Sequence, residues 1–421
     1  MKIKNVVLQA LIVSLLPLSA TAQNNVSIDW YGFVAAQSWI NTHESVAGAE
    51  GFLYLYPTDE KTTPTDTHDR KAVPQGSWFG TMARLGFVLK GPEIFGASSR
   101  AKAELEFSGH TAPGSVLYRH AFIALDWEKS TLTLGQTWHP MNDLFPSTVG
   151  IAIGSPFNAL NRSPQLRYEY YLGSEKKVKL TGAAIFQAAN ASIGHDPSDT
   201  TALQLKTVKS YNFQRNSIFP MFYVGMDFTF GNLKLGGGLE YQRITPFVDL
   251  NDNNKKYYLN GLCGMVQAQY NKDKLSVKAK TLIGHNMSHL GICTGFGQVD
   301  RNGEFIEYAP LAACSSWAQV QYGGALKVGL MGGYMENWGA GKDLVAIYAA
   351  ENGRIANMWR VAPNVQYTVG NMNLGVEYEL TTVAYANKNA IGVSIINANG
   401  TVTDTHKVSN NRLLLSVMYS F

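Results

Sequence analysis

The chain has 421 residues and a formal net charge of +4, a surplus too small to indicate a nucleic-acid partner. Hydrophobic residues make up 45% of the chain and the mean hydropathy is −0.10, values that a water-soluble protein and a membrane β-barrel share, because a barrel hides its apolar side chains on alternate residues. Beyond the first 22 residues, no stretch has the roughly 18 apolar residues of a membrane helix, so any membrane crossing must be made by strands.

The first 22 residues have the pattern of a secretory signal peptide. Lys2 and Lys4 supply the charged start, residues 6–18 are mostly apolar, and the small residues at 20–22 (Ala-Thr-Ala) form the cleavage site. We therefore expect export, with residues 23–421 forming the mature domain.

Sixteen strand-like segments follow, and most are near the roughly nine to eleven residues that a tilted strand needs to cross a bilayer. In chain order they are residues 28–41, 78–90, 98–108, 117–127, 131–138, 165–172, 178–187, 219–230, 233–244, 257–270, 275–284, 316–322, 326–336, 354–369, 372–384 and 412–421.

The links between these segments alternate in length. Links after even-numbered segments are short, as at 91–97, 231–232 and 370–371, whereas links after odd-numbered segments are longer, as at 42–77. Short periplasmic turns and long extracellular loops are typical of an up-and-down transmembrane β-barrel, which is the all-β fold we predict. About sixteen strands leave an aqueous channel inside a barrel.

Alternation within the segments predicts which face meets lipid. Leu374, Val376 and Tyr378 alternate with Glu377 and Glu379, and the last segment likewise places an apolar side chain at every second position up to the terminal Phe. Such an ending resembles the C-terminal assembly signal of bacterial outer-membrane barrels. Because a basic side chain facing hydrocarbon at mid-depth costs roughly 2 to 4 kcal/mol, the charged face should be the lumen.

Counting by this alternation places ten bases and seven acids on the lumen face. The bases are Arg84, Arg100, Lys102, Arg167, Lys179, Lys234, Lys278, Lys280, Lys327 and Arg360, and the acids are Glu104, Glu106, Glu169, Asp227, Glu240, Glu377 and Glu379. A basic channel wall raises the local concentration of anions, unless the charges pair across strands and cancel. The alternation does not place Arg119 or His120.

The connection at residues 139–164 is unusually apolar. It holds Phe145 and six other large apolar residues, with Asp143 and Arg162 as its only full charges. Such a segment is costly to leave in water, so we expect it to fold inward and constrict the pore. Packing between subunits or onto a neighbouring loop is the alternative.

The same region resembles a known family. The run 135–138 (Gly-Gln-Thr-Trp), then Asp143, Phe145-Pro146 and the run 162–168 (Arg-Ser-Pro-Gln-Leu-Arg-Tyr), is similar to the corresponding stretch of DcaP-like outer-membrane porins. The resemblance implies a homotrimer of sixteen-stranded channels in outer-membrane lipid and lipopolysaccharide. It also implies a preference for small anionic solutes such as dicarboxylates.

The remaining motifs indicate no catalytic residue, cofactor or metal site. All nine histidines except His120 fall in predicted loops, where solvated side chains are the simplest interpretation. Cys293 and Cys314 share one predicted loop and could pair in an oxidising compartment, whereas Cys263 falls on a strand. An outer-membrane barrel enzyme, or a surface-binding barrel that works through its long loops, remains the alternative to a passive channel.

Overall fold

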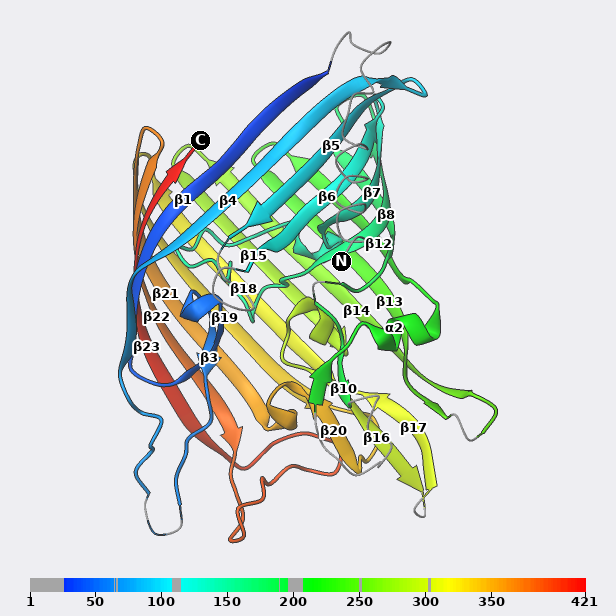
Figure 1. The fold of residues 1–421 in the computed structure, drawn as a ribbon, viewed down its shortest axis with the longest axis vertical. Coiled ribbons are helices and arrows are strands. Elements are labelled where there is room, and N and C mark those ends of the chain that lie inside the picture. Colours follow the sequence, from blue (N-terminus) through cyan, green and yellow to red (C-terminus); the bar gives the residue numbers. More distant parts are fainter. Residues whose placement is uncertain are drawn as a thin grey trace, which may run out of the picture.

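The structure, a computed structural model, is a closed antiparallel barrel of sixteen strands (Figure 1). Residues 26–63, 65, 67–107, 115–188, 190–195, 207–249, 252–301 and 304–421 are described, so the predicted signal peptide lies outside the described residues. Each barrel strand pairs with its neighbours along the chain, and the first closes onto the last through pairs such as Ala36 with Val417. Within the described part of the chain, no helix has the length and apolar character needed to cross a bilayer.

The predicted all-β barrel and its strand number are confirmed. The barrel strands are β1 (Ser27–Asn41), β4 (Gln75–Ile94), β5 (Ala97–Glu106), β6 (Leu117–Asp126), β7 (Ser130–Trp138), β8 (Arg162–Leu172), β9 (Val178–Ile185), β12 (Met221–Phe230), β13 (Leu233–Asp249), β14 (Lys255–Lys272), β15 (Leu275–His285), β18 (Ala312–Gly323), β19 (Leu326–Gly339), β21 (Ile355–Val369), β22 (Met372–Ala386) and β23 (Thr405–Ser420).

The prediction errs mainly at strand ends. β4 and β5 continue through the turn predicted at 91–97, so that only Phe95 and Gly96 connect them, and β23 begins at Thr405 rather than at residue 412. Gly91 and Pro92 hid the extension of β4, because the pairing with β5 shifts register between Lys90 and Glu93. Polar residues hid the start of β23, because ladder pairing continues beyond the stretch in which side chains alternate.

The alternation of faces also holds in the structure. Val376 and Leu415 are paired neighbours with exposed side chains on the outer surface, whereas the adjacent pair, Glu377 and Leu414, is buried inside the barrel. The lipid-facing parity predicted for β22 and β23 is therefore correct.

A β-bulge explains why parity failed on β6. The pairing of β5 with β6 runs from Glu104 opposite His120 to Leu105 opposite Tyr118, which leaves Arg119 as the extra residue. A bulge sets two consecutive residues against one, so strict alternation is lost there. As a result, Arg119 and His120 are both buried, and both contact Glu104.

The long connections gather at the lower end of the barrel in Figure 1 and carry structure of their own that the sequence analysis missed. They contain β2 (Ser45–Gly48) with β3 (Leu53–Pro57), β10 (Ile193–His195) with β11 (Thr207–Lys209), the sheet of β16 (Gly295–Arg301), β17 (Glu304–Pro310) and β20 (Ala346–Ala349), helix α2 (Asn212–Ser217), and the single turns η1 (Ala49–Gly51), η2 (Pro140–Asn142), η3 (Met287–Leu290) and η4 (Ala350–Gly353).

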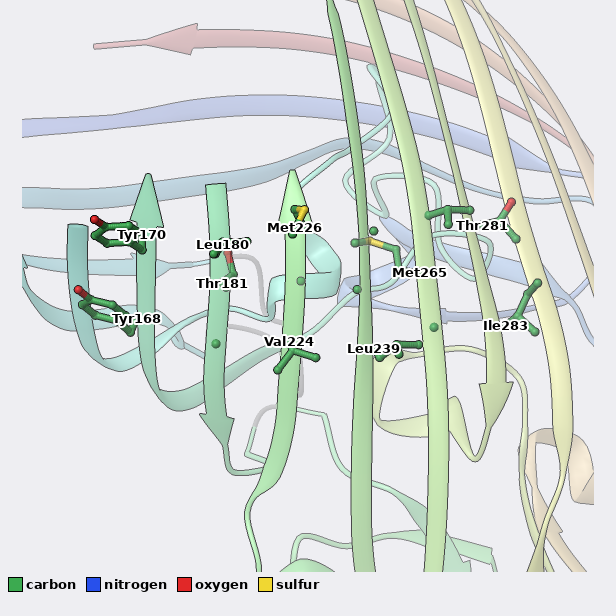
Figure 2. A pocket seen from close by; sticks show the side chains of 16 residues that line it. Tyr168, Tyr170, Leu180, Thr181, Val224, Met226, Leu239, Met265, Thr281 and Ile283 are labelled. Atoms are coloured by element: carbon green, nitrogen blue, oxygen red, sulfur yellow. The ribbon is translucent and has the colours of Figure 1, made fainter. Parts of the chain in front are cut away.

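An apolar hollow of about 870 Å³ lies on the outer wall, over the strands from β8 to β15. Tyr168, Tyr170, Val224 and Leu239 line it, as Figure 2 shows, and each has an exposed or half-exposed side chain on the outward face. The hollow therefore faces away from the lumen and does not belong to a solute pathway.

Candidate solute pathway

The connection between β7 and β8, residues 139–161, runs through the barrel along its inner wall. Lys278 of β15 donates hydrogen bonds to the Phe145 carbonyl and the Ser147 hydroxyl, both at 3.1 Å. Gln319 of β18 accepts from the Ser147 amide at 2.7 Å, and Gln267 of β14 donates to Asp143 at 3.1 Å. Lumen-facing side chains of several strands therefore hold this inner loop.

A single carboxylate holds the tip of the inner loop. Glu377 of β22 is fully buried and accepts hydrogen bonds from the amides of Val149 and Gly150, each at 2.9 Å. Glycines in the wall make room for this contact: a Cβ on Gly375 would lie 2.8 Å from Val149, and one on Gly333 would lie 2.4 Å from the Phe157 ring. The backbone of the wall thus admits the loop at close range.

Two predicted pore-lining bases are buried under the inner loop. Lys280 has a fully buried side chain and lies 3.6 Å from Asp143. Arg360 is 2% exposed, contacts Glu379 at 3.2 Å and donates to the Ser155 carbonyl at 3.1 Å. Both bases lie on the lumen face, as strand parity predicted, but they do not line the pore, because the loop covers them and an acid neutralises each.

On the side of the barrel opposite the strands that hold the inner loop, β4, β5, β6 and β8 place four bases around two acids. This basic cluster consists of Arg84, Lys102, Arg119 and Arg162 around Glu104 and Glu106. Arg119 contacts Glu104 at 2.6 Å and Glu106 at 2.9 Å; Arg84 also contacts both acids, and Lys102 lies 3.7 Å from Glu104. Since four cations share two carboxylates, the cluster keeps a surplus of positive charge.

Arg162 is the member of the basic cluster with unused donors. Its guanidinium stacks on Trp138 with 4.4 Å between the guanidinium carbon and the ring centroid, and Trp138 in turn lies 5.1 Å from the Phe145 ring of the inner loop. Nε and Nη1 of Arg162 have no hydrogen-bond partner among the described residues, although the side chain is only 8% exposed. Aromatic stacking therefore holds a guanidinium that adds its charge to the cluster, while the two unpaired nitrogens are covered by the surrounding protein.

The other predicted bases of this wall are paired. Arg100 contacts Asp126 at 2.6 Å, Arg167 lies 3.8 Å from Glu169, and Lys179 contacts Asp227 at 3.0 Å. Strand parity had placed Arg100, Arg167 and Lys179 correctly on the lumen face, but it could not show their partners. The count of lumen-facing acids missed Asp126, because this residue ends β6 and no alternating side chains follow it in the strand.

The interpretation that the loop histidines are solvated is wrong for His139 and His289. Both are fully buried, with Nε2 atoms 2.6 Å and 2.8 Å from the two carboxylate oxygens of Glu240. The contact of His289 with Glu240 is a hydrogen bond, whereas the contact of His139 with Glu240 does not have the angles of one. Two ligands of one tetrahedral zinc ion stand about 3.3 Å apart, so these shorter separations fit a buried ion-paired cluster better than a metal site.

The predicted disulfide between Cys293 and Cys314 is wrong. Both thiols are free, and Cys314 belongs to β18, on the same face as the exposed Val320. Cys293 is instead buried within the barrel, in the apolar cluster that contains Tyr56. The wall separates the two sulfurs, a fact that a shared predicted loop could not reveal.

Comparison with known proteins identifies the fold. No protein-family model matches the sequence, and no curated protein matches it. Among solved structures, the DcaP outer-membrane channel of Acinetobacter baumannii superimposes with a TM-score of 0.64 at 17% identity, covering 95% of this chain and 99% of that one. OmpT of Vibrio cholerae gives 0.52 at 12% identity (96% and 100% covered), and OmpF of Salmonella typhi in complex with daunomycin gives 0.51 at 13% identity (94% and 97% covered). The chain therefore has the barrel fold of outer-membrane channels and porins, as its resemblance to DcaP-like proteins predicted.

Proposed function

We propose that this protein is an outer-membrane porin, a passive diffusion channel for small hydrophilic solutes that favours anions such as dicarboxylates. The observation that carries the proposal is the basic cluster on β4, β5, β6 and β8, in which four bases share two acids and therefore keep a surplus of positive charge. The Arg84 and Lys102 side chains are 23% and 26% exposed, so a passing dianion would meet the positive charge of the cluster at these two bases.

The inner loop supports the same proposal, because it narrows the lumen from the side of β14 to β22 and covers Lys280 and Arg360 on that side. Solutes are then directed along the wall that carries the basic cluster. A confined, base-rich passage raises the local anion concentration and discriminates by charge. A homotrimer embedded in outer-membrane lipid and lipopolysaccharide is part of the proposal, in line with the trimer form of OmpT among the similar structures.

The test is the reversal potential of the purified protein in a planar bilayer under a potassium chloride gradient. We expect anion preference in dilute salt that shrinks at about 1 M, where the screening length falls to roughly 3 Å. Arg162→Gln should weaken the preference, whereas the control Lys129→Gln, which changes an exposed base in the turn between β6 and β7, should leave it unchanged.

Cation preference in the wild type would refute the anion proposal. A barrel that reaches the bilayer folded but does not conduct would refute the channel itself and favour the alternative, a barrel enzyme or a surface-binding barrel.

A further inference from the structure

A hairpin from the first long connection also enters the barrel. β2 and β3, joined by η1, form this hairpin, which we call the mouth hairpin (residues 45–57). Phe52, which directly precedes β3, and Tyr54 and Tyr56 of β3 occupy alternate positions, and each is at most 4% exposed. Phe52 packs so closely on β4 that a Cβ on Gly80 would lie 1.9 Å from its ring. The hairpin thus buries an aromatic face against the inner wall.

Two buried arginines of the wall hold the mouth hairpin. Arg412 of β23 donates to the Gly51 carbonyl at 2.9 Å, and Arg360 of β21 donates to the Leu55 carbonyl. Both guanidinium groups also lie over the Tyr54 ring, at 5.1 Å and 4.9 Å from its centroid. Since Arg360 binds Ser155 of the inner loop as well, one side chain joins the two inward segments.

Contacts at the base of the hairpin fix it to other connections. The hydroxyl of Tyr385 donates to the Pro57 carbonyl at 2.7 Å. Asp59 is 4% exposed and contacts Arg354 at 2.7 Å, His406 at 2.8 Å and Lys388 at 3.4 Å. These three partners of Asp59 come from the segments around β21, β22 and β23, so contacts on both sides of the hairpin fix it where it enters the barrel.

The mouth hairpin and the inner loop lie at successive depths. Arg412, which holds the hairpin, pairs with Glu379, whereas Leu414 pairs with Glu377, which holds the inner-loop tip. Two residues along a strand correspond to about 7 Å. The hairpin therefore lies nearer than the inner loop to the end of the barrel that carries the long connections.

We propose that the mouth hairpin is a second pore-narrowing element and that Glu50 at its tip is a carboxylate that solutes meet before the basic cluster; this proposal rests on the proposed channel function. Glu50 is exposed and has no ion pair among the described residues, although its neighbour Ala49 is buried. An uncompensated negative charge in a confined passage repels anions. The hairpin then lowers the size limit, and Glu50 moderates the anion preference that the basic cluster creates.

The test uses the full chain in planar bilayers and in liposome swelling with neutral sugars of increasing size. In one variant, Gly-Ser-Gly replaces residues 46–56; β1 and β4 pair along their length without the hairpin, so the barrel is expected to close. We expect higher conductance and faster entry of the larger sugars. Deleting residues 147–155 of the inner loop is the comparison, and it should also raise conductance.

Charge is tested separately with Glu50→Gln, which keeps the shape of the tip. The reversal potential should shift towards stronger anion preference with little change in conductance. The matched control is Asp343→Asn, which removes an exposed acid from another long connection and should shift neither quantity.

The failures are distinguishable. A folded wild type without conductance overturns the proposed channel and this inference together. A conducting wild type whose conductance and size limit are unchanged by hairpin replacement overturns the second narrowing alone. An unchanged reversal potential in Glu50→Gln overturns the role of that carboxylate.

Discussion

Replacing Val376 with arginine tests the orientation of the barrel wall. Val376 is 45% exposed on the outer face of β22 and is paired with Val365 and Leu415, which are exposed on the same face. It lies four residues from the strand end at Met372. With a rise of about 3.3 Å per residue and a tilt of roughly 40°, this corresponds to about 10 Å of depth, near the middle of an apolar band about 25 Å tall.

An arginine at that depth costs about 2–4 kcal/mol, a factor of roughly 30 to 900 in the folding equilibrium. We expect Val376→Arg to lower the free energy of unfolding by this amount, measured in lipid vesicles from the folded fraction on gels at graded urea concentrations. Asn373→Arg is the control, since residue 373 faces the lumen on the same strand, and its stability should stay close to that of the wild type. A Val376→Arg protein within about 1 kcal/mol of the wild type would show that this face does not meet lipid.

Two further predictions concern buried groups. Burial raises the pKa of the Cys293 thiol to about 12, so about one part in 10⁴ is thiolate at pH 8. Cys293 should therefore resist maleimide until the protein is unfolded, and rapid labelling of the folded protein would contradict the burial. Equal masses of the alkylated protein with and without reductant should confirm that the thiols are free. Glu240→Gln removes the partner of His139 and His289, so the free energy of unfolding should fall by about 3–5 kcal/mol, as it does when a buried ion pair is broken. The control is Glu44→Gln, which changes a half-exposed acid paired with Lys71 and should alter stability little. Equal losses of stability in both variants would refute the role of the buried cluster.

The sequence by itself determined the strand number, the strand faces and the inward tendency of residues 139–164. Strand periodicity is local, since side chains at every second position share a face whatever the rest of the chain does. A run such as Leu374, Val376 and Tyr378 against Glu377 and Glu379 therefore reveals both the strand and its orientation. The same locality explains the failure at Arg119, because a bulge depends on the partner strand.

Tertiary structure decided which lumen charges remain free. Lys280 and Arg360 obey the alternation rule, yet both are covered, because the covering segments come from connections more than a hundred residues away in the chain. The alternation of Phe52, Tyr54 and Tyr56 in the sequence indicates a strand in the mouth hairpin, but the sequence does not show where on the inner wall this strand packs.

Pairing across the barrel is likewise invisible in sequence. His139, Glu240 and His289 lie far apart along the chain and meet only when the barrel closes, and Cys293 and Cys314 lie near each other in sequence and end on different sides of the wall. Local side-chain patterns are set by backbone geometry, whereas burial and charge pairing are set by whichever distant segments fill the lumen, and this is why the fold was predictable and the free charges of the pathway were not.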